Sequence, residues 1–285
     1  DSNGIAIAAN SLSLNGGTIL DLAGNATTLT HSAVSDNASY LVDTTPPTAP
    51  TSLADSAIVG GYVRSTTQTL TANAQTGTTV NVYDTNGTTL LGSAVAVNGA
   101  ASVTVAGLTQ GAHTLSAKAM DAAGNESTAS NTVVLNVDSI LPTVSSVAIT
   151  GATGVANSTV NAGDVVTVTV TLSEAVAVTG TPKLGLTVGS TVVQANYSAT
   201  GSTATQLKFN YTILATQTDA NGIAIAANSL SLNGGTILDL AGNATTLTHS
   251  AVSDNAGYFV DTTAATVSSV AITGATGIAN STLNA

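Results

Sequence analysis

The chain has 285 residues, of which 43% are hydrophobic and 7% charged, and it contains no cysteine. This length allows two or three domains, the apolar content argues against disorder, and the lack of cysteine excludes disulfide bonds and thiolate metal sites. Four basic residues stand against fifteen acidic ones, so the formal net charge is −11. Such a charge repels nucleic acid and anionic lipid and attracts cations, and no stretch is apolar enough to predict a membrane span.

The chain contains two kinds of internal repeat. Residues 1–45 recur at 219–263 with three differences, and residues 143–162 recur at 266–285 with two differences. The spacing between copies gives a module B of 123 residues and a second module, A, of about 95 residues that lies between two copies of B. We therefore expect four segments: the C-terminal part of a B module at 1–45, a complete A module at 46–141, a complete B module at 142–263, and the start of another B module at 264–285.

Both modules are predicted to consist of short antiparallel strands. Val, Ala, Leu and Ile alternate with Thr and Ser, which is typical of sandwich strands that bury one face. The strands predicted in module A are 68–72, 79–83, 88–94, 101–105, 113–120 and 131–137, with an irregular edge strand around 53–62. Those predicted in module B are 144–150, 165–172, 183–188, 191–197, 206–213, 223–232, 236–238 and a run that ends at 258–260.

The alternation also predicts which side chains form the core. In module A these are Leu70, Val80, Val82, Val103, Val105, Leu115, Ala117, Ala119, Val133, Leu135 and Val137. In module B, one predicted face consists of Val166, Val168, Val170 and Leu172, and another of Leu207, Phe209, Tyr211 and Ile213.

A five-residue sequence, Asp-x-Ala-Gly-Asn, occurs at 21–25, 121–125 and 239–243. An Asp that can accept hydrogen bonds from nearby backbone N–H groups, followed by Gly, predicts a tight turn. The same carboxylate is a hard oxygen ligand for a metal ion. The residues alone are compatible with an Asx-turn and with a cation site, and both interpretations stay open.

Two longer runs carry a family resemblance. Residues 111–125, which read GAHTLSAKAMDAAGN, together with Val137-Asp138, resemble the bacterial Ig-like domains of giant repetitive adhesins that are secreted by the type I route. Module B resembles a related Ig-like repeat through residues 172–176, 219–223, 232–237 and 260–263. The resemblance implies all-β Ig-like sandwiches arranged end to end as a rod, with calcium at the junctions. The chain departs from the family at His113, where the family usually has Tyr.

Sandwich topology sorts the acidic residues into three groups. The loop before the last strand of an Ig-like sandwich lies at its N-terminal pole, beside the preceding linker. The predicted metal ligands are Asp43, Asp121 and Glu126 around the start of module A, Asp138, Glu174 and Asp239 at the A-to-B junction, and Asp164, Asp219 and Asp261 at the C-terminal pole of module B. Clustered carboxylates repel one another unless a cation or protons intervene, so we expect structural Ca²⁺ between domains. Outside these groups, Asp36, Asp55, Asp84 and Asp254 are predicted to be solvated turn residues.

Three classes of function are compared. The near-identical repeats favour a structural stalk segment of a secreted adhesin at the bacterial cell surface, whose partners are neighbouring repeats of the same chain, with host or matrix glycan or protein bound through other regions. The alternative is an adhesive module that binds glycan or protein through its loops, although the few tyrosines argue against a sugar site. An enzyme is not expected, because the three histidines accompany no nucleophile–base motif and are predicted to be surface or capping residues.

Overall fold

The structure is a computed structural model that describes residues 1–274, 278–279 and 282–283. In this part of the chain the secondary structure consists of strands, turns and bends without a helix, which confirms the predicted all-β class. Accordingly, no helix in the described residues is long and apolar enough to cross a membrane. The chain divides into two compact units, Asp1–Ser139 and Ile140–Ala285.

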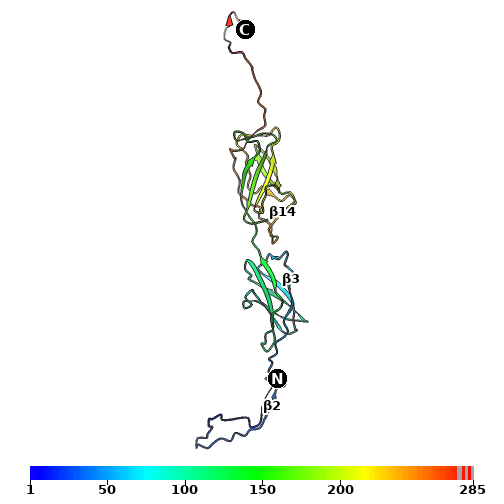
Figure 1. Cartoon of the computed structure of the whole chain (residues 1–285), viewed down its shortest axis with the longest axis vertical. Coiled ribbons are helices and arrows are strands. Elements are labelled where there is room, and N and C mark those ends of the chain that lie inside the picture. Colours follow the sequence, from blue (N-terminus) through cyan, green and yellow to red (C-terminus); the bar gives the residue numbers. More distant parts are fainter. Residues whose placement is uncertain (275–277, 280–281, 284–285) are drawn as a thin grey trace. The chain divides into compact units, whose positions relative to one another are not determined.

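Unit 1 contains the first ten strands, coloured blue to green in Figure 1. They are β1 (Ile5–Ile7), β2 (Val34–Asn37), β3 (Thr51–Asp55), β4 (Tyr62–Val63), β5 (Gln68–Asn73), β6 (Thr79–Tyr83), β7 (Leu90–Val95), β8 (Ala100–Val105), β9 (Gly111–Met120) and β10 (Val133–Val137). Module A is formed by two sheets, β4-β10-β9-β6-β7 and β3-β5-β8, while β1 and β2 pair only with each other.

The alternating pattern of module A produces its core. Every side chain predicted to face inward, from Leu70 in β5 to Val137 in β10, is buried. The two sheets pack these residues against each other, with Leu53 from β3 and Leu108 from the loop before β9 completing the cluster. The six predicted strands of this module are present within two residues of their expected bounds.

Unit 2 contains the remaining strands. They are β11 (Val144–Ala152), β12 (Thr159–Val160), β13 (Val165–Leu172), β14 (Ala177–Thr179), β15 (Lys183–Val188), β16 (Thr191–Ser198), β17 (Gln206–Thr212), β18 (Thr218–Asp219), β19 (Leu230–Ser231), β20 (Thr236–Leu238), β21 (Phe259–Asp261), β22 (Ile278–Ala279) and β23 (Thr282–Leu283). The main sheet has the order β11-β13-β17-β16-β15-β19, and smaller sheets are formed by β12-β21-β18, β14-β20 and β22-β23.

The core of unit 2 is centred on Phe209, which is fully buried and meets Tyr197 edge to face with ring centroids 6.0 Å apart. The four residues predicted on one face of β13 are all buried. Of the second predicted set, Leu207 and Phe209 on β17 and Ile213 just after it are buried, and Tyr211 is half-buried.

One strand prediction in unit 2 is wrong. Residues 223–232 do not form one strand, because Asn228 takes a φ of 58° and turns the backbone between two isolated bridges and β19. The short strands β12, β14 and β18 were not predicted, since two or three residues carry no detectable alternation.

In each unit a short early strand pairs in parallel with a late one. β4 pairs with β10 through Tyr62 and Val63, opposite Asn136 and Val137. β12 pairs with β21 in the same way. These parallel pairs bring the beginning and the end of each module to the same sheet edge.

Candidate metal centres at the Asp-x-Ala-Gly-Asn turns

The turn at 121–125 is held by the side chain of its first residue. Asp121 Oδ1 accepts hydrogen bonds from the N–H groups of Ala123 and Asn125, both at 2.9 Å, and Oδ2 accepts one from Asn125 Nδ2 at 2.9 Å. Gly124 takes a φ of 89°, a conformation that favours glycine. The hydrogen bond from the Asn125 side chain, aided by backbone N–H groups, lowers the pKa of Asp121.

The other two copies have the same hydrogen bonds to Asn. Asp21 accepts from the N–H of Asn25 at 2.8 Å and from its Nδ2 at 2.9 Å, and Asp239 accepts from the corresponding atoms of Asn243 at the same two distances. The predicted tight turn is therefore present three times. These hydrogen bonds explain why each copy has Asp and Asn without a metal ion. A cation bound at a turn would be held by a carboxylate that already stabilises that turn.

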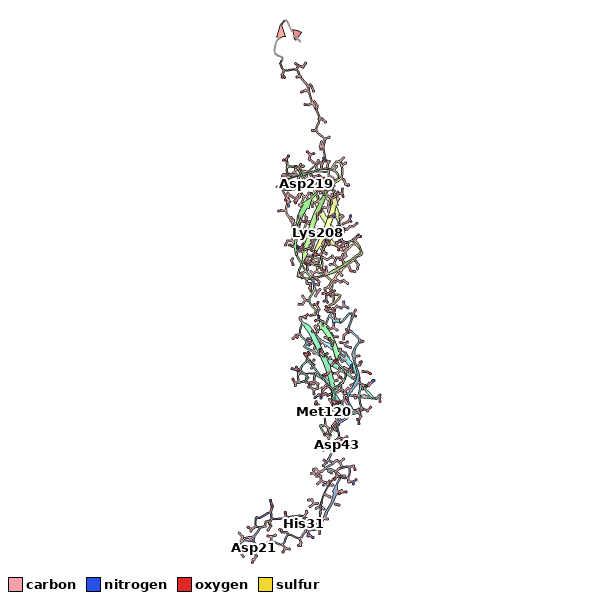
Figure 2. The ribbon with its side chains drawn as sticks, in the orientation of Figure 1. Asp21, His31, Asp43, Met120, Lys208 and Asp219 are labelled. Atoms are coloured by element: carbon pink, nitrogen blue, oxygen red, sulfur yellow. The ribbon has the colours of Figure 1, made fainter. Side chains whose placement is uncertain are left out.

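In unit 1, the turn lies beside the linker that precedes module A, as the topology predicts. Asn125 Nδ2 also donates to the carbonyl oxygen of Asp43 at 3.1 Å. Asp43, labelled in Figure 2, and Asp121 line one cavity of about 590 Å³, together with residues 75–78.

Glu126, the third predicted ligand at this pole, has other partners. Its carboxylate accepts from Lys118 Nζ at 2.8 Å and from the Tyr83 hydroxyl at 3.0 Å, and Lys118 Nζ lies 5.8 Å from the Tyr83 ring centroid. The bond from Lys118, followed by that from Tyr83, lowers the pKa of Glu126, whereas burial and then Glu126 raise the pKa of Tyr83. In the described residues, Glu126 does not join Asp43 and Asp121 as a three-ligand group.

In unit 2, the structure brings Glu174 and Asp239 together. Glu174 follows β13 and is half-buried, and Asp239 follows β20 and is buried. Each offers a carboxylate oxygen within 4.8 Å of the other. Two oxygens at 2.3–2.6 Å from one Ca²⁺ ion can be separated by this distance, so the pair fits a hard cation.

The backbone that enters unit 2 lies between the same two loops. Thr246 N–H donates to Pro142 O at 2.8 Å, and Ser173 N–H donates to Thr143 O at 2.9 Å. Asp138, the linker residue predicted as a third ligand, is the next-to-last residue of unit 1. It is half-buried there, and its N–H donates to Val63 O at 2.9 Å.

At the C-terminal pole of module B, the predicted acids are engaged in local hydrogen bonds. Asp219, labelled in Figure 2, is buried and accepts from the N–H groups of Gly189, Asn221 and Gly222 at 2.8–3.0 Å. Asp164 accepts from the N–H of Asn161 at 2.7 Å.

Asp261, exposed, accepts from the N–H of Thr263 at 2.8 Å. Asp219 and Asp261 line one cavity of about 410 Å³, which Asp164 does not reach. Over the part of the chain that the structure describes, these three acids form no group with metal-ligand separations. A cation at this pole stays a prediction.

Two predictions about isolated residues are wrong. Asp84, expected to be a solvated turn residue, forms an ion pair with His113, its Oδ2 lying 3.0 Å from Nδ1. His113, expected to be a surface or capping residue, is buried and belongs to this ion pair. His249 is buried as well, but it has the predicted capping role, because its Nε2 accepts from the N–H groups of Ser229 and Leu230. The departure from Tyr at position 113 was the one sequence signal that could have pointed to the ion pair.

The comparisons with known proteins agree with this architecture. Residues 47–136 match the family model described as the bacterial Ig domain. No match is found among curated proteins. Similar solved structures include the fibronectin(III)-like modules of Clostridium thermocellum CbhA, at 18% identity and a TM-score of 0.30, covering 74% of this chain and 93% of that one.

A second similar structure is a tetra-tandem repeat in the extending region of a large adhesion protein, at 16% identity and a TM-score of 0.30. That alignment covers 84% of this chain and 55% of the other. At such values the likeness assigns neither a fold nor a role. The family match, which covers most of module A, indicates an Ig-like fold for that module.

Proposed function

We propose that this chain is a stalk segment of a secreted adhesin at the bacterial cell surface, in which Ig-like modules follow one another end to end and supply reach and stiffness. The observation that carries the proposal is the repetition itself: residues 1–45 and 219–263 differ at three positions only. A pocket or active site confined to one copy would be expected to show local departures between the copies, and 42 of 45 positions match. A mechanical role is performed by every copy alike, and the match of residues 47–136 to a bacterial Ig domain supports this role.

We further propose that one Ca²⁺ ion is shared by Asp138, Glu174 and Asp239. The separation of the Glu174 and Asp239 oxygens, within 4.8 Å, suits two ligands of one Ca²⁺, and two carboxylates this close repel each other without a cation or a proton. Pro142 is the fourth residue after Asp138, so the chain cannot carry Asp138 more than about 14 Å from that residue. Backbone carbonyls and water would complete the six to eight oxygens that Ca²⁺ prefers.

Because Asp138 belongs to the linker, binding of the ion would also restrict the motion of the linker. Glu174 and Asp239 belong to loops of one module, whereas Asp138 directly follows β10 of the preceding module. An ion held by all three would restrain the linker, because any change in the linker backbone would move one ligand against the other two. When bound, Ca²⁺ supplies charge neutralisation and a fixed ligand distance, and it takes part in no reaction.

Isothermal titration calorimetry tests the ligand assignment. Glu174→Gln and Asp138→Asn remove one charge each with little change of shape, and each should weaken Ca²⁺ binding at least tenfold. Asp254→Asn is the matched control, since it removes one charge from an exposed acid of the same unit and should leave binding unchanged. Absence of binding at millimolar Ca²⁺, or equal weakening by all three substitutions, would show that the assignment is wrong.

A separate pair of experiments tests the stalk role. Small-angle scattering of the full chain should show a narrower distribution of interdomain distances in Ca²⁺ than in chelator, and Glu174→Gln should remove the difference. A glycan array probes the alternative, an adhesive module. Reproducible binding of one glycan class by the full chain would refute a purely structural role.

A further inference from the structure

Both ring nitrogens of His113 face an acceptor. Nδ1 lies 3.0 and 3.2 Å from the two carboxylate oxygens of Asp84, and Nε2 lies 2.9 Å from the carbonyl oxygen of Thr109. The ring is buried, so these partners stand in place of water. A neutral imidazole carries one N–H and can donate to one of the two partners, whereas the protonated ring donates to both. The arrangement therefore fits the protonated form of His113.

Loss of one proton would leave Nδ1–H on the Asp84 carboxylate, the stronger acceptor, and take the hydrogen from Nε2. Nε2 would then present a lone pair to the Thr109 carbonyl oxygen, and two acceptors at 2.9 Å repel each other. The hydroxyl of the same threonine lies 3.4 Å from Nε2 and can donate to the neutral ring instead. That exchange requires the Thr109 carbonyl to move away from the ring. The loop before β9 therefore has two arrangements, which differ by one proton on His113.

The loop that His113 holds also holds the linker. Gln110, the residue after Thr109, donates from Nε2 to Ser139 Oγ at 2.6 Å and accepts from the N–H of Ser139 at 3.1 Å. Ser139 is the last residue of unit 1 and follows the end of β10 by two positions. The Thr109 carbonyl and the Gln110 nitrogen belong to one planar peptide group, so a movement of that carbonyl reorients the backbone of Gln110. The proton on Nε2 is thus linked to both hydrogen bonds of Ser139.

His113 stands in place of a residue that does not titrate near neutral pH. In Ig-like sandwiches, a tyrosine near the start of the equivalent strand bonds its hydroxyl to the backbone a few residues upstream. The bond from His113 to the carbonyl oxygen of Thr109, four residues upstream, is of this kind. A tyrosine keeps its proton up to about pH 10, whereas an imidazole in ordinary surroundings changes its charge between about pH 5 and 8. Histidine thus makes this corner of module A sensitive to pH.

Asp84, in the loop between β6 and β7, is the charged group that faces His113. Burial raises its pKa, but the bonds from Thr85 N–H and from His113 lower it below 3.8, so the carboxyl is ionised throughout the range in which an imidazole titrates. Strands β5, β7, β8 and β10 carry no ionisable side chain. Within the described residues, the other ionisable side chains on or next to the surrounding strands, which form no bond with His113, are Asp55, Tyr62, Arg64, Tyr83, Lys118 and Asp138.

We propose that His113, Thr109 and Gln110 form a proton-dependent latch on the end of unit 1. The latch is closed when His113 is protonated, and Gln110 then holds Ser139 just after β10. It opens when His113 becomes neutral, because the Thr109 carbonyl leaves the ring and the backbone of Gln110 turns with it. All four residues belong to unit 1, so the latch depends neither on the stalk role nor on a bound Ca²⁺ ion. Its release at higher pH gives the chain beyond β10 more freedom.

NMR of the full chain in chelator tests the latch through two signals that a merely structural contact would not couple. The nitrogen chemical shifts of the His113 ring report its protonation, and the order parameter of the Ser139 N–H reports whether Gln110 holds this residue. From about pH 5 to about pH 8, that order parameter should fall from about 0.85 towards about 0.6. The fall should have the same midpoint as the titration of the ring. An order parameter of Ser139 that does not change over this range would overturn the proposal.

Substitutions assign the effect to the latch. His113→Gln keeps a side-chain N–H donor but cannot titrate, so Ser139 should stay ordered over the whole range. Gln110→Ala removes both bonds to Ser139, which should then be mobile at both ends of the range while the His113 titration persists. Because Gln110 is exposed, this variant tests the latch even if His113→Gln fails to fold. His31→Gln, at the other histidine of unit 1, is the control and should leave the transition unchanged. A pH transition of Ser139 that persists in His113→Gln or in Gln110→Ala would overturn the proposal.

Discussion

Removal of the Asp84 carboxylate should destabilise unit 1 at two places. Asp84 lies in the loop that connects β6 to β7, and its Oδ2 is 3.0 Å from His113 Nδ1. Its Oδ1 accepts from the N–H of Thr85 at 2.7 Å and from the hydroxyl of Thr85 at 3.0 Å, and that hydroxyl in turn accepts from the N–H of Thr114. Asp84→Ala therefore opens both the ion pair and the hydrogen bonds that join the loop to β9.

The burial of the two partners sets the magnitude. The side chain of His113 is 7% exposed and that of Asp84 is 23% exposed, so the pair lies between a surface ion pair and a fully buried one. A hydrogen bond to a charged group contributes about 1.5–3 kcal/mol, and a neutral one about 0.5–1.5 kcal/mol. We expect Asp84→Ala to lower the free energy of unfolding of unit 1 by about 2–4 kcal/mol, below the roughly 3–5 kcal/mol of a fully buried pair.

A double-mutant cycle with His113→Ala separates the pair from the turn. Urea unfolding of the full chain, followed through amide-exchange protection of β9 and β10, should give a coupling energy of about 1.5–3 kcal/mol between Asp84 and His113. Asp36→Ala, at an exposed acid of the same unit, should change stability by less than about 0.5 kcal/mol. A coupling energy below about 0.5 kcal/mol would refute the reasoning, because the ion pair would then contribute nothing beyond the turn.

The same pair has a pH signature. Burial raises the pKa of Asp84, but the Thr85 N–H and His113 bonds outweigh it, so that the pKa is lowered from its ordinary value of 3.8. A carboxyl with a lowered pKa stabilises the fold above its unfolded pKa, and this contribution is lost as the pH falls through the folded value. Unit 1 should lose stability below about pH 4, and Asp84→Ala should make that loss smaller.

Three further substitutions test the neighbouring contacts. Asn125→Ala should raise the pKa of Asp121 toward its ordinary value, since the Asn125 side chain is the main cause of the lowering; an unchanged carboxyl titration by NMR contradicts this. Glu126→Gln should lower the pKa of Tyr83 only in part, because burial is the larger cause of its increase, and ring-proton NMR against pH measures the change. His249→Ala should destabilise unit 2 by about 1–3 kcal/mol in urea, since a buried and a half-buried N–H group lose their acceptor. The same substitution at the equivalent His31, whose bond from Leu12 N–H is exposed, should matter less.

The strands were predictable where the alternation is long and one face is buried. In β13, Val166, Val168 and Val170 follow period two, and the predicted bounds are those observed. The expected strand at 223–232 failed because its alternation changes phase: Ile223 and Ile225 share one parity, Leu230 and Leu232 the other. Asn228, with its positive φ, turns the chain between the two pairs.

The candidate site was predictable as far as topology brings loops together. The position of the Asp-x-Ala-Gly-Asn turn beside the preceding linker follows from the order of the strands, and the bond from Asn125 to Asp43 is in agreement with it. The partner of each acid was not predictable in the same way. Glu126 contacts Lys118 across a turn, and Asp84 contacts a histidine 29 residues away, because side-chain pairing depends on register between strands that no local pattern contains.

The parallel pairs at the module edges have a consequence for a chain under tension. In unit 1, β4 lies near the start of module A and β10 at its end, and backbone bonds of 2.9 Å join Asn136 to Gly61 and Asp138 to Val63. Because the two strands run in the same direction, a force that pulls the ends of the module apart slides one strand along the other and loads these bonds together. An antiparallel hairpin pulled at its open end would instead break its bonds one after another. β12 and β21 place unit 2 under the same loading, so each module should resist extension at this edge until the shared bonds fail in a single step.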